Sequence, residues 1–122
     1  MKYEFDNERP IYSQMADLIT KEIISGKLKP GQKLPSVREY AGLMKANPNT
    51  VCKALDLLEA SKLIYTERTN GKFVTTDLVL IDVFKKELLS SQIDSFMSDM
   101  NKMGISKEEI INILMEKSKW VY

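Results

Sequence analysis

Two helix-start signals and one hairpin signal follow one another within residues 34–75, and their order constrains the fold more than any other feature. Ser36 and Glu39 have the spacing of a capping box, in which each residue's side chain accepts from the other's backbone amide. Asn47 before Pro48 pairs a favoured N-cap with a favoured first helical residue. Asn70-Gly71 marks a two-residue hairpin turn between the strand-like segments 63–67 and 72–75. Helix, helix and hairpin in this order predict a winged helix-turn-helix.

Apolar spacing supports this interpretation. Residues 10–25 are expected to form a first helix, with Pro10 in its first turn, Gly26 as its C-cap and core positions Ile11, Met15, Leu18, Ile19 and Ile23. In the helix that runs from Asn47 to about residue 60, the apolar face is made of Val51, Ala54, Leu55 and Leu58. At about 100° per residue, Asn49, Lys53 and Asp56 point the opposite way. We therefore expect Asn49 and Lys53, with Thr50 beside them, to project from the N-terminal end of this helix.

The charge distribution separates the middle of the chain from its ends. The 122 residues carry a net charge of only +1. Residues 27–76, however, hold nine basic and four acidic side chains, a net +5, whereas residues 1–26 and 77–122 each carry a net −2. A basic segment between acidic ends is typical of a phosphate-binding region, and it favours nucleic acid as the partner.

Composition also excludes several classes of function. The chain has no histidine and one cysteine, Cys52, so the usual zinc sites, an internal disulfide and histidine-dependent nucleophilic catalysis are excluded. With no paired acid and base, we expect neither an enzyme nor a metal or cofactor. The polar residues 1–8 and the short aliphatic run 78–81 predict neither a signal peptide nor a membrane helix, so a cytoplasmic location is expected.

Several motifs occur together in a recognisable order. They are Pro10-Ile-Tyr-Ser-Gln14, Gly26-Lys-Leu-Lys-Pro-Gly-Gln-Lys-Leu-Pro-Ser-Val-Arg-Glu39, Asn47-Pro-Asn-Thr-Val51, Lys53-Ala54 and Gly71-Lys-Phe-Val74. As a set they resemble the GntR family of bacterial transcription regulators, and the Asn47–Val51 run and short tail resemble its YtrA subfamily. The resemblance implies a homodimer that binds a near-palindromic operator on double-stranded DNA. Such proteins are usually repressors, often of their own operon and of adjacent transporter genes.

The resemblance also implies which residues contact DNA. Carried over by position, these are Arg38, Asn49, Thr50, Lys53, Arg68 and Gly71, and the candidate set is completed by Ser36, Asn47, Asn70 and Lys72. Two positions depart from the family pattern. Lys53 stands where an arginine is common, and the 68–71 loop is less glycine-rich and less basic than is typical. For Arg38 the alternative is a surface salt bridge to a neighbouring glutamate.

The chain changes character after residue 76. Residues 78–103 have a long helical pattern that ends at Gly104, and a second capping box, Ser106 with Glu109, opens a helix that is expected to reach Trp120. We expect two regions, a winged helix-turn-helix over residues 1–76 and a helical hairpin over 77–122 that forms the dimer. The candidate interface residues are Phe84, Leu88, Ile93, Phe96, Met100, Ile110, Leu114 and Trp120.

Two further readings stay open at this stage. A small-molecule effector at the dimer interface is compatible with the sequence, although nothing in it identifies one. The alternative function is a winged-helix module that binds another protein through its tail and binds DNA only weakly and without sequence preference.

Overall fold

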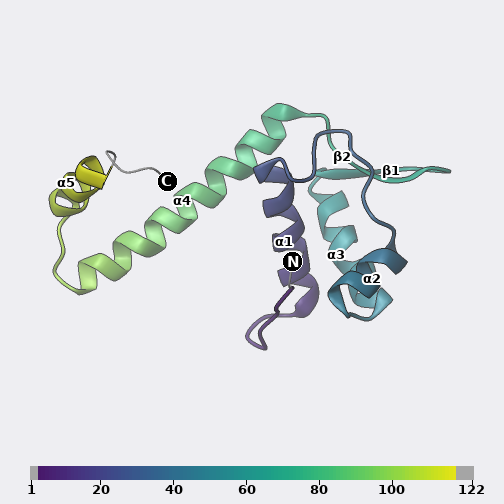
Figure 1. The fold of residues 1–122 in the computed structure, drawn as a ribbon, viewed down its shortest axis with the longest axis horizontal. Helices are drawn as coiled ribbons and strands as arrows, with labels where there is room; N and C mark the ends of the chain where they lie inside the picture. Colours follow the sequence, from purple (N-terminus) through teal and green to yellow (C-terminus); the bar gives the residue numbers. More distant parts are fainter. Residues whose placement is uncertain (1–2, 118–122) are drawn as a thin grey trace. The chain divides into compact units, whose positions relative to one another are not determined.

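The computed structural model describes residues 3–117 and has the expected architecture, mainly helical with one small hairpin (Figure 1). The element order is α1 (Ile11–Ser25), α2 (Val37–Met44), α3 (Pro48–Ala60), β1 (Ile64–Glu67), β2 (Gly71–Val74), α4 (Leu78–Lys102) and α5 (Lys107–Lys117). The chain divides into two compact units, Met1–Phe84 and Lys85–Tyr122. The division lies within α4, so the first unit includes the first turns of that helix, whereas the sequence-based boundary at residue 76 precedes it.

The predicted helix starts are confirmed. The Ser36 hydroxyl accepts from the Glu39 amide at 3.1 Å, and Glu39 Oε1 accepts from the Ser36 amide at 3.0 Å. Asn47 Oδ1 accepts from the Asn49 amide at 2.8 Å, with Pro48 as the first residue of α3. Pro10 is the N-cap residue of α1 and not part of its first turn. This difference of one residue leaves the apolar face of α1 unchanged.

The core of the first unit forms where α1, α2 and α3 meet. The four expected α3 residues are buried, and α3 contacts both α1 and α2. Met15, Ile19 and Ile23 of α1 are buried with them, while Leu18 and Ile11 are only half-buried. Since removing apolar surface from water is the main favourable term in folding, this three-helix contact fixes which face of α3 remains exposed.

The hairpin is present, but its turn differs from the prediction. Glu67 pairs with Gly71, so the loop has three residues, 68–70, and Gly71 is the first residue of β2. The expected two-residue Asn70-Gly71 turn is therefore wrong. Two bonds close the longer loop: Asn70 donates its backbone amide to Glu67 O at 3.1 Å and its side-chain amide to Glu67 Oε2 at 3.2 Å. Gly71 then has a φ of 106°, a conformation that glycine adopts without a steric penalty.

A third segment pairs with the hairpin. The Leu34 amide donates to Lys72 O at 2.8 Å, the Val74 amide donates to Gln32 O at 2.9 Å, and Lys33 forms a bridge with Phe73. The loop that leads into α2 thus runs antiparallel to β2. This pairing ties the hairpin to the start of α2.

Helix α4 begins and ends as the sequence predicts to within a residue, and α5 begins directly after the predicted capping box. Gly104 ends α4 with a φ of 74°, and the Ile105 amide bonds back to Met100 O at 3.0 Å. The second capping box is formed, with the Glu109 amide 3.2 Å from the Ser106 hydroxyl. Trp120 lies outside the described residues. None of the helices between residues 3 and 117 combines the length and hydropathy needed to cross a lipid bilayer.

Candidate nucleic-acid interface

The exposed face of α3 carries polar side chains near its N-terminal end. Asn49 and Lys53 are exposed and Thr50 is half-buried, as expected from the burial of the opposite face. Asn47 has a structural use, because its side chain caps the helix. The side-chain amide of Asn49, in contrast, takes part in none of the hydrogen bonds formed within residues 3–117, and this exposed group is available to a ligand.

Lys53 has a neighbour that the sequence analysis missed. Its Nζ lies 5.9 Å from the centroid of the Tyr12 ring, which belongs to the first turn of α1. The two residues line a shallow cleft of about 320 Å³ together with Asp56 and Leu57. No spacing in the sequence relates Tyr12 to Lys53, so only the packing of α1 on α3 reveals the pair.

The start of α2 contributes a second cation. Arg38 is exposed, and it takes part in none of the ion pairs formed by the described residues. The alternative of a salt bridge to a neighbouring glutamate is therefore not supported. Ser36 and Glu39 are occupied with each other in the capping box, and these hydrogen bonds hold the pKa of Glu39 below its usual value.

The hairpin carries two of the candidate DNA-binding cations, Arg68 and Lys72, and only Arg68 lies at its tip. Arg68 is exposed in the 68–70 loop, whereas Lys72 reaches back toward α3. Lys72 Nζ lies 2.8 Å from both Glu59 Oε1 and Thr66 Oγ1. The hydrogen bonds from Lys72 and then Thr66 lower the pKa of the Glu59 carboxyl. Glu59 is a second residue that the sequence analysis missed, since nothing in the spacing pairs it with Lys72.

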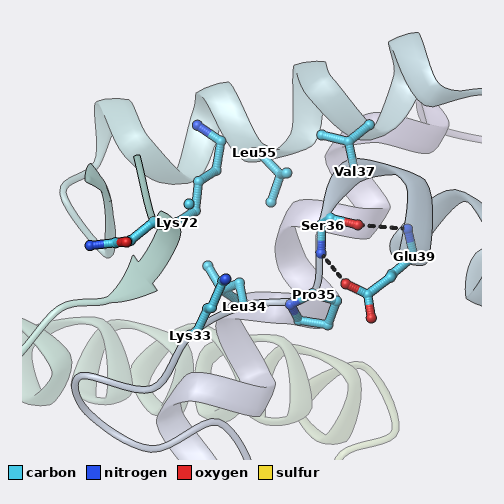
Figure 2. Close-up of a pocket in the computed structure, with 10 residues that line it drawn as sticks. Lys33, Leu34, Pro35, Ser36, Val37, Glu39, Leu55 and Lys72 are labelled. Carbon is cyan, nitrogen blue, oxygen red and sulfur yellow. Dashed lines mark hydrogen bonds between the residues drawn. The ribbon is translucent and has the colours of Figure 1, made fainter. Parts of the chain in front are cut away.

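A hollow of about 290 Å³ joins these parts. It is lined by the loop before α2, the hairpin and Leu55 of α3. Figure 2 shows Lys33 and Lys72 toward one end of this hollow and the Ser36–Glu39 capping box toward the other. Lys33 lies so close to the hairpin that a Cβ on Gly71 would be 3.2 Å from its Cε. The start of α2 and the hairpin therefore share one surface, as the candidate DNA-binding residues require.

The chemistry of the candidate residues suits a polyanion. Arg38, Lys53 and Arg68 are exposed cations, and Asn49 has an exposed side-chain amide. Within residues 3–117 there is no cluster of three or more histidine, cysteine, aspartate or glutamate side chains that could hold a metal ion. Cys52 is a free thiol on the exposed side of α3. The arrangement can donate hydrogen bonds and positive charge to phosphates and base edges.

The candidate dimer residues are less buried than core residues. Phe84 packs against the core of the first unit and is half-buried, as are Leu88, Met100 and Ile110. Ile93, Phe96 and Leu114 are exposed at 49%, 48% and 60%. Exposed apolar side chains mark an interface when they form a contiguous patch, so these residues remain candidates for the dimer contact.

Comparison with known proteins identifies the family. The pattern of the bacterial regulatory proteins of the gntR family matches residues 11–74. The HTH-type transcriptional repressor YtrA of Bacillus subtilis (strain 168) is 34% identical over 111 residues, which are 89% of this chain and 85% of YtrA. A GntR family transcriptional regulator from Listeria monocytogenes has a similar structure, with a TM-score of 0.84 and 38% identity over 92% of this chain and 98% of that one.

A further solved structure contains DNA. The AraR DNA-binding domain in complex with operator ORX1 superposes with a TM-score of 0.56 and 28% identity, over 62% of this chain and 99% of that domain. The family pattern and the YtrA similarity agree with the winged helix described above. The chain belongs to the gntR family of bacterial regulatory proteins and is a YtrA-like transcriptional regulator.

Proposed function

We propose that this regulator binds a specific operator as a homodimer and represses transcription, including that of its own operon and adjacent transporter genes. The observation that supports this most directly is the exposure of Asn49 and Lys53 at the start of α3, with the aliphatic face of the helix buried. The operator complex of the related AraR domain supports the same use of the winged helix. A regulator of this kind acts in the cytoplasm.

In this proposal the first turns of α3 enter the major groove. The Asn49 amide can pair with the N6 and N7 positions of adenine, and the Lys53 ammonium can donate to guanine O6 and N7 or to a phosphate. Arg38 and Arg68 contact the backbone on either side, and Ser36, Asn47, Thr50, Asn70 and Gly71 line the same surface. Lys72 supports the wing through Glu59 more than it contacts DNA, because its side chain is 27% exposed and its ammonium already binds the Glu59 carboxylate.

The dimer in this proposal forms through the tail. Leu89, Ile93, Phe96, Met100 and Met103 recur at spacings of four and three along α4, the pattern of a helix-packing seam. A two-fold axis through this seam gives an inverted-repeat operator. The half-site centres then lie about 34 Å apart or a multiple of it.

A mobility-shift titration tests the proposal. The probes are the DNA upstream of the protein's own gene and a random duplex of equal length, both at a fixed salt concentration. We expect the protein to prefer the upstream probe. If Lys53 and Arg38 contact bases, Lys53→Ala and Arg38→Ala should each weaken binding to that probe by about 1–3 kcal/mol. If they contact only phosphates, each variant should lower the slope of log affinity against log salt concentration by about one. Equal affinity for both probes would instead support the protein-interaction module.

A further inference from the structure

We infer that Tyr12 is a positioning residue for DNA reading, because its ring holds the Lys53 ammonium on the exposed face of α3. The inference deepens the proposed function and rests on it. It starts from the contact between Lys53 and Tyr12, in which Lys53 Nζ lies 5.9 Å from the centroid of the Tyr12 ring.

The ring is held in place by the local structure of α1. Tyr12 is half-buried and packs against the core of the first unit. The Pro10 carbonyl accepts from the amides of Ser13 and Gln14 at 3.1 and 3.3 Å. Gln14 is buried and donates its side-chain amide to the Arg9 carbonyl at 2.9 Å. These bonds hold the backbone from which Tyr12 projects, and packing against the core limits the movement of its ring.

Asp56 is an acidic residue that could compete with the Tyr12 ring for the Lys53 ammonium. Asp56 lies one turn further along α3 and lines the same cleft, and residues three apart on a helix can form an ion pair. None of the ion pairs formed by the described residues joins Lys53 to Asp56. The aromatic ring attracts the cation without neutralising it. Lys53 therefore keeps its full charge for a phosphate or a base edge.

The contact with Tyr12 should also reduce the rotamer freedom that the Lys53 side chain loses when it binds DNA. Lysine has a long flexible stem, and much of its rotamer freedom is lost when a ligand holds the ammonium. A ring that already restricts the stem reduces that loss. For an exposed cation–π contact, we expect removal of the ring to weaken operator binding about two- to fivefold.

The test compares Tyr12→Leu, which removes the ring, with Tyr12→Phe, which keeps it, in both the native and the Lys53→Ala backgrounds. Binding to the upstream DNA probe is titrated at one salt concentration and in a salt series. The side-chain methylene protons of Lys53 are observed by NMR in the protein without DNA, since protons that lie over a ring are shifted upfield. Unfolding curves check that each variant is folded.

We expect Tyr12→Leu to lose the upfield shift and bind about two- to fivefold more weakly, and Tyr12→Phe to match the native protein in both respects. In the Lys53→Ala background, Tyr12→Leu should have no further effect. Any of three results would overturn the inference. Tyr12→Leu could weaken DNA binding in the Lys53→Ala background as much as in the native one, or Tyr12→Phe could weaken it as much as Tyr12→Leu does. The third such result is a native protein whose Lys53 methylene protons show no upfield shift. If the native protein fails to prefer the upstream probe while the shift is present, it is the proposed function that fails, and the role of Tyr12 in DNA reading fails with it.

Discussion

Lys72 Nζ lies 2.8 Å from Glu59 Oε1, and this ion pair connects the second strand of the hairpin to the last turn of α3. Thr66 completes the contact, since its hydroxyl donates to the same carboxylate oxygen at 2.6 Å. On the other side of the hairpin, backbone bonds join β2 to the loop before α2. The hairpin is therefore held from two sides, which fixes where its exposed tip presents Arg68.

Replacing Glu59 with glutamine tests this anchor through pH. Folding lowers the pKa of the Glu59 carboxyl below its ordinary value of 4.5. The ionised carboxylate therefore stabilises the fold above pH 4.5, and this stabilisation is lost as the pH falls through the lower pKa of the folded protein. We expect Glu59→Gln to reduce the free energy of unfolding at pH 7 by about 0.2–1 kcal/mol, as for other exposed pairs, and the difference from the native protein to shrink below pH 4.5. Urea titrations at several pH values measure it. Glu87→Gln, an exposed position in α4, is the control, and an equal pH trend there would refute the assignment.

Gly71→Ala tests the backbone conformation of the hairpin. A side chain at φ 106° is strained, and its Cβ would lie 3.2 Å from Lys33 Cε. We expect the free energy of unfolding to fall by about 1–3 kcal/mol. Gly42→Ala is the matched control, because it lies within α2 with nothing within 4 Å of the added Cβ, and it should be neutral or stabilising by about 0.4–1 kcal/mol. Thermal or urea unfolding compares the two, and similar effects at both glycines would contradict the argument.

Two neighbouring asparagines should separate stability from DNA binding. Asn47 caps α3, so Asn47→Ala should lower the free energy of unfolding by about 1 kcal/mol. The Asn49 side chain is exposed, so Asn49→Ala should leave unfolding unchanged and weaken binding to the upstream DNA by about 1–3 kcal/mol. Unfolding curves and mobility shifts on both variants measure these effects. A loss of stability with Asn49→Ala, without a loss of binding, would reverse the proposed roles.

The tail prediction concerns oligomeric state. Phe96 lies on the proposed seam of α4 and is 48% exposed, so Phe96→Glu would bring a charge into the dimer contact. We expect this variant to sediment as a monomer where the native protein sediments as a dimer, and to lose affinity for an inverted-repeat probe. Ser91→Glu, which places the same charge on the opposite side of α4, should remain dimeric. A native protein that sediments as a monomer, or a dimeric Phe96→Glu variant, would exclude this seam as the interface.

The sequence predicted the elements with local causes. The start of α2 follows from Ser36 and Glu39, and the start of α3 from Asn47 and Pro48, because each cap is formed by atoms within four residues. Periodicity then identified the buried face of α3 and so the exposure of Asn49 and Lys53. The turn of the hairpin was predicted less well. Asn70-Gly71 favours a two-residue turn, but the bonds from Asn70 to Glu67 and the pairing of β2 with residues 32–34 favour the three-residue loop.

What the sequence by itself determined is therefore the helices, the hairpin, the basic middle of the chain and its family resemblance. Only the tertiary structure decided how the charged side chains are used. Lys72 was expected among the DNA-binding residues and bonds to Glu59. Lys53 was expected to project outward, and its ammonium lies over the Tyr12 ring. The physical reason is that caps and periodicity depend on neighbours along one segment, whereas the partner of a long cationic side chain depends on which separate elements pack beside it.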